Sequence, residues 1–224
     1  MNGLHWGITL FIIILSYAVS IAAKMMIKLT YLKYDDVETE KRISGAGAAR
    51  AVLDSMMLSY VSVERIRSDQ SDRNTPTRVE LSESTFDSDS VAAVSMAAFR
   101  AGHVMQQSDG YSLNPLTDIA ETVSAVCSHF LMAVLFVGSL FSIGPLIRFG
   151  AVLFVVMAVF QAVMLISELN AGKRAVAVLR NENILSESEL DGAEKVMRAA
   201  ALIYAAALVS LVLSLARMAS GSDK

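Results

Sequence analysis

The sequence predicts a mainly α-helical membrane protein, with about four transmembrane helices and a small α+β soluble domain inserted between the first two. Three observations lead to this fold class. Of the 224 residues, 54% are hydrophobic and 18% are charged, whereas about 25% of an ordinary soluble domain is charged. The apolar residues gather in four uncharged stretches. A polar segment of suitable length for a small domain separates the first stretch from the second.

The first uncharged stretch runs from Met1 to Ala23. As a helix it is long enough to cross a hydrocarbon core of about 30 Å. A cleaved signal peptide is the alternative, but it would carry its basic residues before the apolar run. Here Lys24, Lys28 and Lys33 follow the run. We therefore expect residues 1–35 to form an uncleaved membrane anchor with a basic flank.

The second and third uncharged stretches are Thr122–Ile147 and Phe149–Ser167. Only Arg148 separates them, so residues 121–167 are predicted to form a transmembrane hairpin of two antiparallel helices. The fourth stretch, Ala199–Ala216, is rich in alanine, and residues 199–224 are predicted to hold the last span and a tail. A buried helix of a soluble domain is the alternative for this fourth stretch.

The distribution of Lys and Arg predicts the orientation. Eleven of the 19 basic residues lie between Lys24 and Arg100, and five lie between Lys173 and Arg198. Four spans place both segments on one side, which is then the cytoplasmic or matrix side. We expect a bacterial plasma membrane or an organelle inner membrane. The net charge of −3 argues against nucleic acid as a partner.

Residues 36–120 are predicted to be the soluble α+β domain, because some of their segments have apolar residues at helical spacing and others alternate apolar and polar residues as strands do. Asp and Ser residues at 87–90 offer caps for its last helix. The predicted order is a helix over 45–58, a strand over 59–66, a polar loop over 68–77, a strand over 78–81 and a helix over 91–107.

Residues 168–198 are predicted to form a helical segment that packs on this soluble domain. Ser186-Glu187-Ser188-Glu189 has the pattern of a capping box. It predicts the start of a helix that continues without a break into the fourth span. The single cysteine, Cys127, excludes an intrachain disulfide framework.

Residues 79–106, VELSESTFDSDSVAAVSMAAFRAGHVMQ, carry a family resemblance. They resemble the neutral zinc metallopeptidases of small bacterial membrane proteins, in which a strand ending in L-S-E precedes a helix with A-A-H-E-x-G-H-A-x-Q. The similarity extends to GAGAARAVLD at 45–54, ELNAGKRAVAVL at 168–179 and EKVMRAAALIYAAALV at 194–209. The resemblance implies a zincin-like fold for the soluble domain.

In the family motif, two histidines at i and i+4 lie on one helix face and hold zinc. The glutamate between them is the general base. The resemblance places Phe99 at the first histidine position and Arg100 at the glutamate position, and His103 alone remains. Glu168 matches the third zinc ligand, and Asn170 replaces an aspartate two residues later.

These replacements predict a degenerate site without catalytic residues. A catalytic zinc generally needs three protein ligands, and His103 and Glu168 are the two residual ligand candidates. Arg100 cannot act as a general base, because a guanidinium is not deprotonated in proteins. We therefore expect a pseudoenzyme that has neither a bound metal nor a cofactor.

Other interpretations of the same residues remain open. His103 is also consistent with a core histidine bonded to a backbone carbonyl. Glu168 is also consistent with an ion pair to Arg100 that replaces the metal bridge. His129, within the second uncharged stretch, is an intramembrane ionisable residue and so a functional candidate, with a neutral packed imidazole as the alternative.

The expected function follows from the retained scaffold and the lost catalytic groups. We expect an inactive metallopeptidase homologue that acts as a structural or accessory subunit of a larger membrane protein complex, with the lipid bilayer and other membrane subunits as partners. One alternative is a divergent membrane-bound zinc metallopeptidase. Another is a regulatory pseudopeptidase that binds an active homologue or its substrates.

Overall fold

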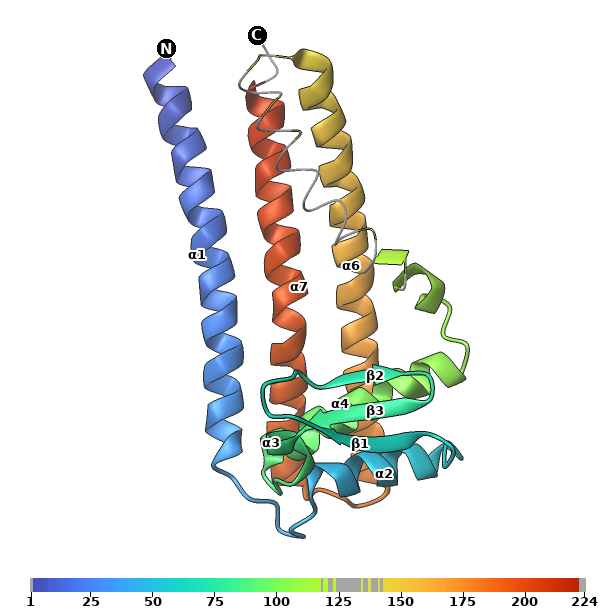
Figure 1. Cartoon of the computed structure of the whole chain (residues 1–224). Coiled ribbons are helices and arrows are strands. Elements are labelled where there is room, and N and C mark those ends of the chain that lie inside the picture. The colour runs from blue at the N-terminus through green and yellow to red at the C-terminus, as the bar shows by residue number, and fades with distance from the viewer. Residues whose placement is uncertain are drawn as a thin grey trace. The chain divides into compact units, whose positions relative to one another are not determined.

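The computed structural model describes residues 2–117, 119–120, 123, 134, 137, 141 and 143–221. Three long helices and a small sheet make up most of the described chain (Figure 1). The helices and strands are, in chain order, α1 (Asn2–Asp35), α2 (Gly45–Ser55), β1 (Ser62–Ile66), β2 (Arg73–Thr75), β3 (Arg78–Ser82), α3 (Glu83–Phe86), α4 (Val91–Ser108), α6 (Gly144–Asn181) and α7 (Glu187–Gly221).

Three of these helices are long and apolar enough to cross a membrane, over Ile14–Asp35, Gly144–Asn181 and Glu187–Ala216. This confirms a mainly helical protein with candidate membrane spans and a small sheet. Most of the predicted second span over 122–147, including Cys127 and His129, lies outside the described residues. The count of four spans therefore stays a prediction.

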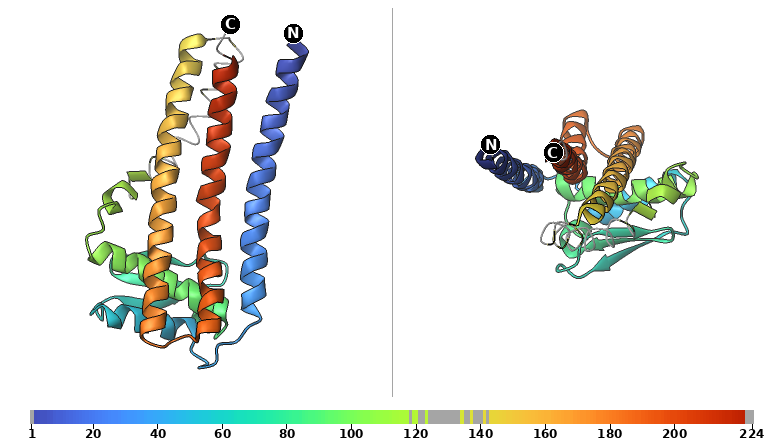
Figure 2. Two further views of the ribbon diagram at one scale, coloured as in Figure 1. Left: turned by 180° about the vertical axis from the view of Figure 1, so that it is seen from behind. Right: turned by 90° about the horizontal axis from the view of Figure 1, so that it is seen from above.

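The chain forms two compact units. The first comprises residues 1–24, 115–166 and 202–224, and the second comprises residues 25–114 and 167–201. In the first unit, Phe154 and Met157 of α6 pack with Leu211 of α7 in a buried cluster. The two helices run side by side in both views of Figure 2.

The sheet of the second unit has the strand order β1-β3-β2. β1 runs parallel to β3, with Val63 opposite Val79, and β2 runs antiparallel to it, with Arg73 opposite Glu80. The predicted strand over 59–66 is confirmed as the shorter β1, and the predicted strand over 78–81 is confirmed as β3, which extends one residue further to Ser82. The prediction of a loop over 68–77 was wrong, because this segment contains β2.

The polar triplet of β2 carries no alternating pattern that the sequence could reveal. Its strand conformation comes from its partner, since Arg73 forms an ion pair with the buried Glu80 of β3. Nearby, Asp72 accepts hydrogen bonds from the Ser82 amide and the Thr85 hydroxyl, each at 2.7 Å. These contacts fix the hairpin between β2 and β3.

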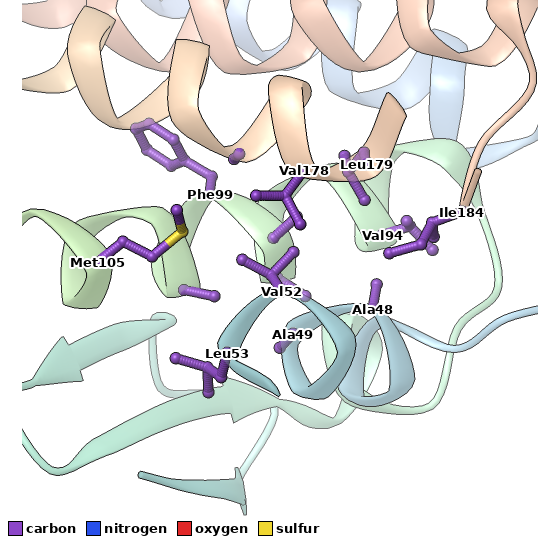
Figure 3. Packing of buried hydrophobic residues seen from close by; sticks show 14 of the residues in the cluster. Ala48, Ala49, Val52, Leu53, Val94, Phe99, Met105, Val178, Leu179 and Ile184 are labelled. Atoms are coloured by element: carbon purple, nitrogen blue, oxygen red, sulfur yellow. The ribbon is translucent and has the colours of Figure 1, made fainter. Parts of the chain in front are cut away.

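Helix α4 confirms the predicted helix over 91–107 almost residue for residue. Its N-cap is Ser90, whose hydroxyl accepts a hydrogen bond from the Ala93 amide at 3.1 Å. Most of its side chains are buried, because it is covered on more than one side. Figure 3 shows Val52 of α2, Val94 of α4 and Leu179 of α6 in one hydrophobic core.

The third predicted span and the helical segment after it are one continuous helix, α6. Its end is a Schellman motif, in which the Ile184 amide donates to the Leu179 carbonyl at 2.8 Å and Asn183 has a φ of 51°. The predicted capping box then starts α7, since Glu189 accepts a hydrogen bond from the Ser186 amide at 2.7 Å. The continuation of this helix into the last span is also confirmed.

Candidate functional site

The five candidate site positions lie on two helices of the second unit. Phe99, Arg100 and His103 are on α4, and Glu168 and Asn170 are on α6. Residues 99 and 103 share one face of α4, since they are one turn apart. The two helices approach closely where α4 carries Gly102. The chain thus brings a remaining histidine and a remaining acidic residue to one place.

His103 and Glu168 face each other across this helix contact. His103 Nε2 lies 3.5 Å from Glu168 Oε2, and the two side chains are only 15% and 10% exposed. The contact lacks hydrogen-bond geometry, and Nε2 of His103 is a buried atom without a hydrogen-bond partner. The two side chains are therefore close enough to form an ion pair or to share a metal ion, but they do not hydrogen-bond to each other.

The other ring nitrogen of His103 is paired with a side chain. His103 Nδ1 lies 3.1 Å from Oε1 of Gln106, so the expected backbone carbonyl partner was wrong. Because Oε1 is an acceptor, Nδ1 carries the proton and donates it. A neutral ring then presents an unprotonated Nε2 to the Glu168 carboxylate. An N–H donor faces Glu168 only when the ring is an imidazolium.

Gln106 joins the two helices through its amide nitrogen. This buried nitrogen donates to the Ser167 carbonyl at 2.9 Å and to Asn170 Oδ1 at 3.0 Å. Asn170 Oδ1 also accepts from Arg174 Nε at 2.9 Å, and Arg174 in turn pairs with Asp109 at 2.5 Å. Asn170 is therefore occupied by a polar network that ties α4 to α6.

Phe99 is part of the hydrophobic core, with an exposed fraction of 1%. Its ring stands edge-on to the His103 ring, with 4.8 Å between the centroids. It also packs toward α6, because a Cβ at Gly172 would lie 3.7 Å from Phe99 Cε2. Figure 3 shows this ring directed at the α6 ribbon. An aromatic hydrocarbon thus fills the space beside His103 and Glu168.

Arg100 does not pair with Glu168, so the alternative interpretation of an ion pair between these two residues was wrong. The side chain that lies beside Glu168 is His103, with Nε2 and Oε2 3.5 Å apart. Arg100 has no ion pair among the described residues, and its Nε is buried without a hydrogen-bond partner. Its guanidinium carbon lies 5.9 Å from the Phe99 ring centroid. The guanidinium instead stays beside the aromatic ring of its neighbour on α4, where a cation–π contact is favourable.

The described residues around His103 and Glu168 do not supply the donor set of a catalytic zinc ion. His103 and Glu168 are two donors, whereas a catalytic site uses three protein ligands and an open position. The orphaned Nε2 of His103 is the kind of atom that a metal would satisfy. Phe99, however, offers no ligand atom where a third donor would stand. No cluster of three or more His, Cys, Asp or Glu suited to a metal is found among the described residues.

A pocket of about 210 Å³ lies beside the site, between the parts of α6 and α7 that belong to the second unit. Glu168 contributes to its wall. Sequence reasoning missed this pocket and the Gln106 network. The glutamine three residues after the retained histidine was the signal for the network, because i and i+3 side chains meet on a helix.

Comparison with known proteins agrees with the architecture of the chain. Residues 9–222 match a protein family described as "Putative neutral zinc metallopeptidase". The chain is 34% identical over 209 residues to "Putative membrane protease YugP" of Bacillus subtilis (strain 168). That match covers 90% of this chain and 91% of the relative. No solved structure matches the chain significantly.

Proposed function

Because the chain belongs to this neutral zinc metallopeptidase family, we propose that it keeps the membrane scaffold of a peptidase without the hydrolytic activity. In this proposal it serves as a structural or accessory subunit of a larger membrane protein complex. The chain would sit in a bacterial plasma membrane or an organelle inner membrane, with its polar segment on the cytoplasmic or matrix side. Its lipid contacts would be made by the apolar helices.

The position of Phe99 is the observation that carries this proposal. Its ring is buried in the core, and the family resemblance places this residue at the position of the first zinc ligand. The resemblance places Arg100 at the position of the general base, and a guanidinium does not give up its proton in proteins. A site with two ligands and no base lacks both the metal-bound water and the group that would deprotonate it.

A reversion experiment tests the loss of activity. The double variant Phe99→His with Arg100→Glu restores the sequence H-E-A-G-H on α4. We expect the purified wild type to contain zinc well below one ion per chain and to leave a casein substrate uncut, and the double variant to gain zinc. The single variant Phe99→Leu is the matched control, because it changes the ring without adding a ligand. Chelator-sensitive proteolysis by the wild type, abolished by His103→Ala, would refute the proposal.

A purification experiment tests the accessory role. Extraction in a mild detergent should bring stoichiometric membrane subunits along with the chain. The proposal fails if the chain leaves the column as a monodisperse species without other proteins at every detergent and salt condition tried. If the accompanying protein is a peptidase or a peptidase substrate, the regulatory pseudopeptidase alternative is favoured over a structural role.

One observation favours the enzymatic alternative, a divergent membrane-bound zinc metallopeptidase. His103 Nε2 and Glu168 Oε2 are 3.5 Å apart, which is close to the spacing of two ligands that share a tetrahedral ion at about 2.1 Å each. A third ligand from a residue outside the described ranges, or from a partner subunit, would complete such a site. The zinc content of the wild type distinguishes this alternative from the proposed function.

A further inference from the structure

The pocket between α6 and α7 carries several charged side chains at its rim. Its α6 wall is one helix face and includes Glu168, Gly172 and Lys173. Its α7 wall includes Met197 and Arg198. The pocket therefore combines an apolar floor with a charged rim, within a single compact unit of the chain.

The cations at this rim are available to a ligand. Lys173 is exposed and has no carboxylate partner among the described residues. Arg198 pairs at 2.5 Å with Glu194, four residues earlier on the same helix, and the two side chains are 67% and 43% exposed. Such an exposed pair contributes little to stability, so an anion can replace Glu194 as the partner of Arg198 at small cost.

The pocket lies where both helices leave their uncharged stretches. Glu168 is the first charged residue of α6 after Phe149–Ser167, and Arg198 is the last charged residue of α7 before Ala199–Ala216. If these stretches cross a bilayer, Lys173 and Arg198 stand at the level of the lipid headgroups. Basic side chains at that level attract anionic lipids.

We propose that this pocket binds the headgroup of an anionic phospholipid from the surrounding bilayer. The lipid phosphate contacts Lys173 and Arg198, and the glycerol and first methylene groups lie on the apolar floor that Leu169 and Met197 provide. Two carboxylates also line the pocket: Glu168, whose side chain is only 10% exposed and lies against His103, and Glu194, which pairs with Arg198. The proposal does not depend on whether the chain hydrolyses peptides.

A lipid titration of the full chain in an uncharged detergent tests this proposal. The probes are short-chain phosphatidylglycerol, short-chain phosphatidylcholine and glycerol phosphate, and the readout is an apparent Kd from the shift in unfolding temperature. Phosphatidylglycerol should bind most tightly. Lys173→Ala and Arg198→Ala should each raise its Kd about fivefold, the effect of removing one cation near an anionic lipid surface.

Two further variants separate a built pocket from general surface charge. Lys195→Ala removes an exposed cation of α7 that does not line the pocket, and it should leave the Kd unchanged. Ala177→Phe fills the pocket from an exposed α6 position without altering charge, and it should weaken binding. Circular dichroism of each variant confirms that the helices are intact.

Three outcomes would overturn the proposal. In the first, Lys195→Ala weakens binding as much as Lys173→Ala does, so that no particular cation matters. In the second, phosphatidylcholine binds as tightly as phosphatidylglycerol, which excludes recognition of the anionic headgroup. In the third, glycerol phosphate competes at the same concentration as the lipid, which assigns the pocket to a soluble anion instead.

Discussion

Gly102 of α4 lies directly against Ala171 of α6, so that a Cβ atom at Gly102 would come within 2.7 Å of the Ala171 carbonyl oxygen. This contact is closer than real Cβ atoms tolerate, and the obstacle is a backbone atom that cannot rotate away. The missing side chain therefore sets the spacing of the two helices. At that spacing, His103 reaches Glu168 from one helix to the other.

The first prediction concerns this contact. Gly102→Ala should lower stability by about 1–3 kcal/mol, the usual effect of overpacking a close-packed interior. Alanine is the better helix former, so a loss of stability would show that the helix contact outweighs propensity. The measurement is the unfolding temperature in detergent, followed by circular dichroism.

Gly172→Ala is the matched control for this prediction. A Cβ at Gly172 would meet the Met197 Cβ at 3.4 Å, which is an ordinary contact distance. This variant should leave the unfolding temperature unchanged or raise it slightly, through the gain in helix propensity. Equal losses for the two glycine variants would contradict the proposed close approach at Gly102.

The second prediction concerns Gln106, whose amide bridges α4 and α6. Gln106→Leu should destabilise the protein by about 1–3 kcal/mol, because it leaves buried partners without their hydrogen bonds. Gln107→Leu is the control at the next position, where the side-chain oxygen is buried without a hydrogen-bond partner. Its loss should be neutral or stabilising. Thermal unfolding of both variants decides whether the network or mere burial of a glutamine matters.

The third prediction concerns the partner of Glu168. A double-mutant cycle of His103→Ala with Glu168→Ala should give a coupling energy of about 0.5–3 kcal/mol, as contacting residues do. The cycle of Arg100→Ala with Glu168→Ala should be additive within about 0.5 kcal/mol, since these residues form no ion pair. A larger coupling for Arg100 than for His103 would restore the ion pair that the sequence suggested.

The fourth prediction concerns Met57, at the end of α2. This residue has a φ of 58° and an exposed fraction of 89%, and a left-handed conformation costs a non-glycine residue about 1–2 kcal/mol. Met57→Gly should therefore stabilise the protein by about 0.5–1 kcal/mol. Asn183→Gly, at the equivalent position after α6, should gain less, because asparagine tolerates this conformation better. A destabilised Met57→Gly variant would mean that the side chain makes a contact worth more than its strain.

The amino-acid sequence predicted the elements whose signals are local. Ser90 predicts the start of α4, because a hydroxyl at the N-cap can accept a hydrogen bond from a backbone amide in the first turn of the helix. The capping box at Ser186–Glu189 predicts the start of α7, because the Glu189 side chain can accept a hydrogen bond from the Ser186 amide. The uncharged stretches predicted long apolar helices, since few other structures can use so many apolar residues in sequence.

A strand that forms only by pairing with another strand could not be predicted from the sequence. β2 has a polar sequence of three residues, and it becomes a strand only through its pairing with β3. Register and pairing join residues through space, and a short strand has too few positions for a pattern to emerge. The β-hairpin was therefore mistaken for a loop.

By itself, the sequence determined which side chains are available at the candidate site. The family resemblance places Phe99 and Arg100 at the positions of a histidine and a glutamate, and neither side chain can act as a zinc ligand or a general base. Tertiary structure decided how the remaining groups combine. It placed Glu168 beside His103, because the missing side chain of Gly102 lets α4 and α6 approach closely. Such distances arise only when two helices far apart in the chain share one core.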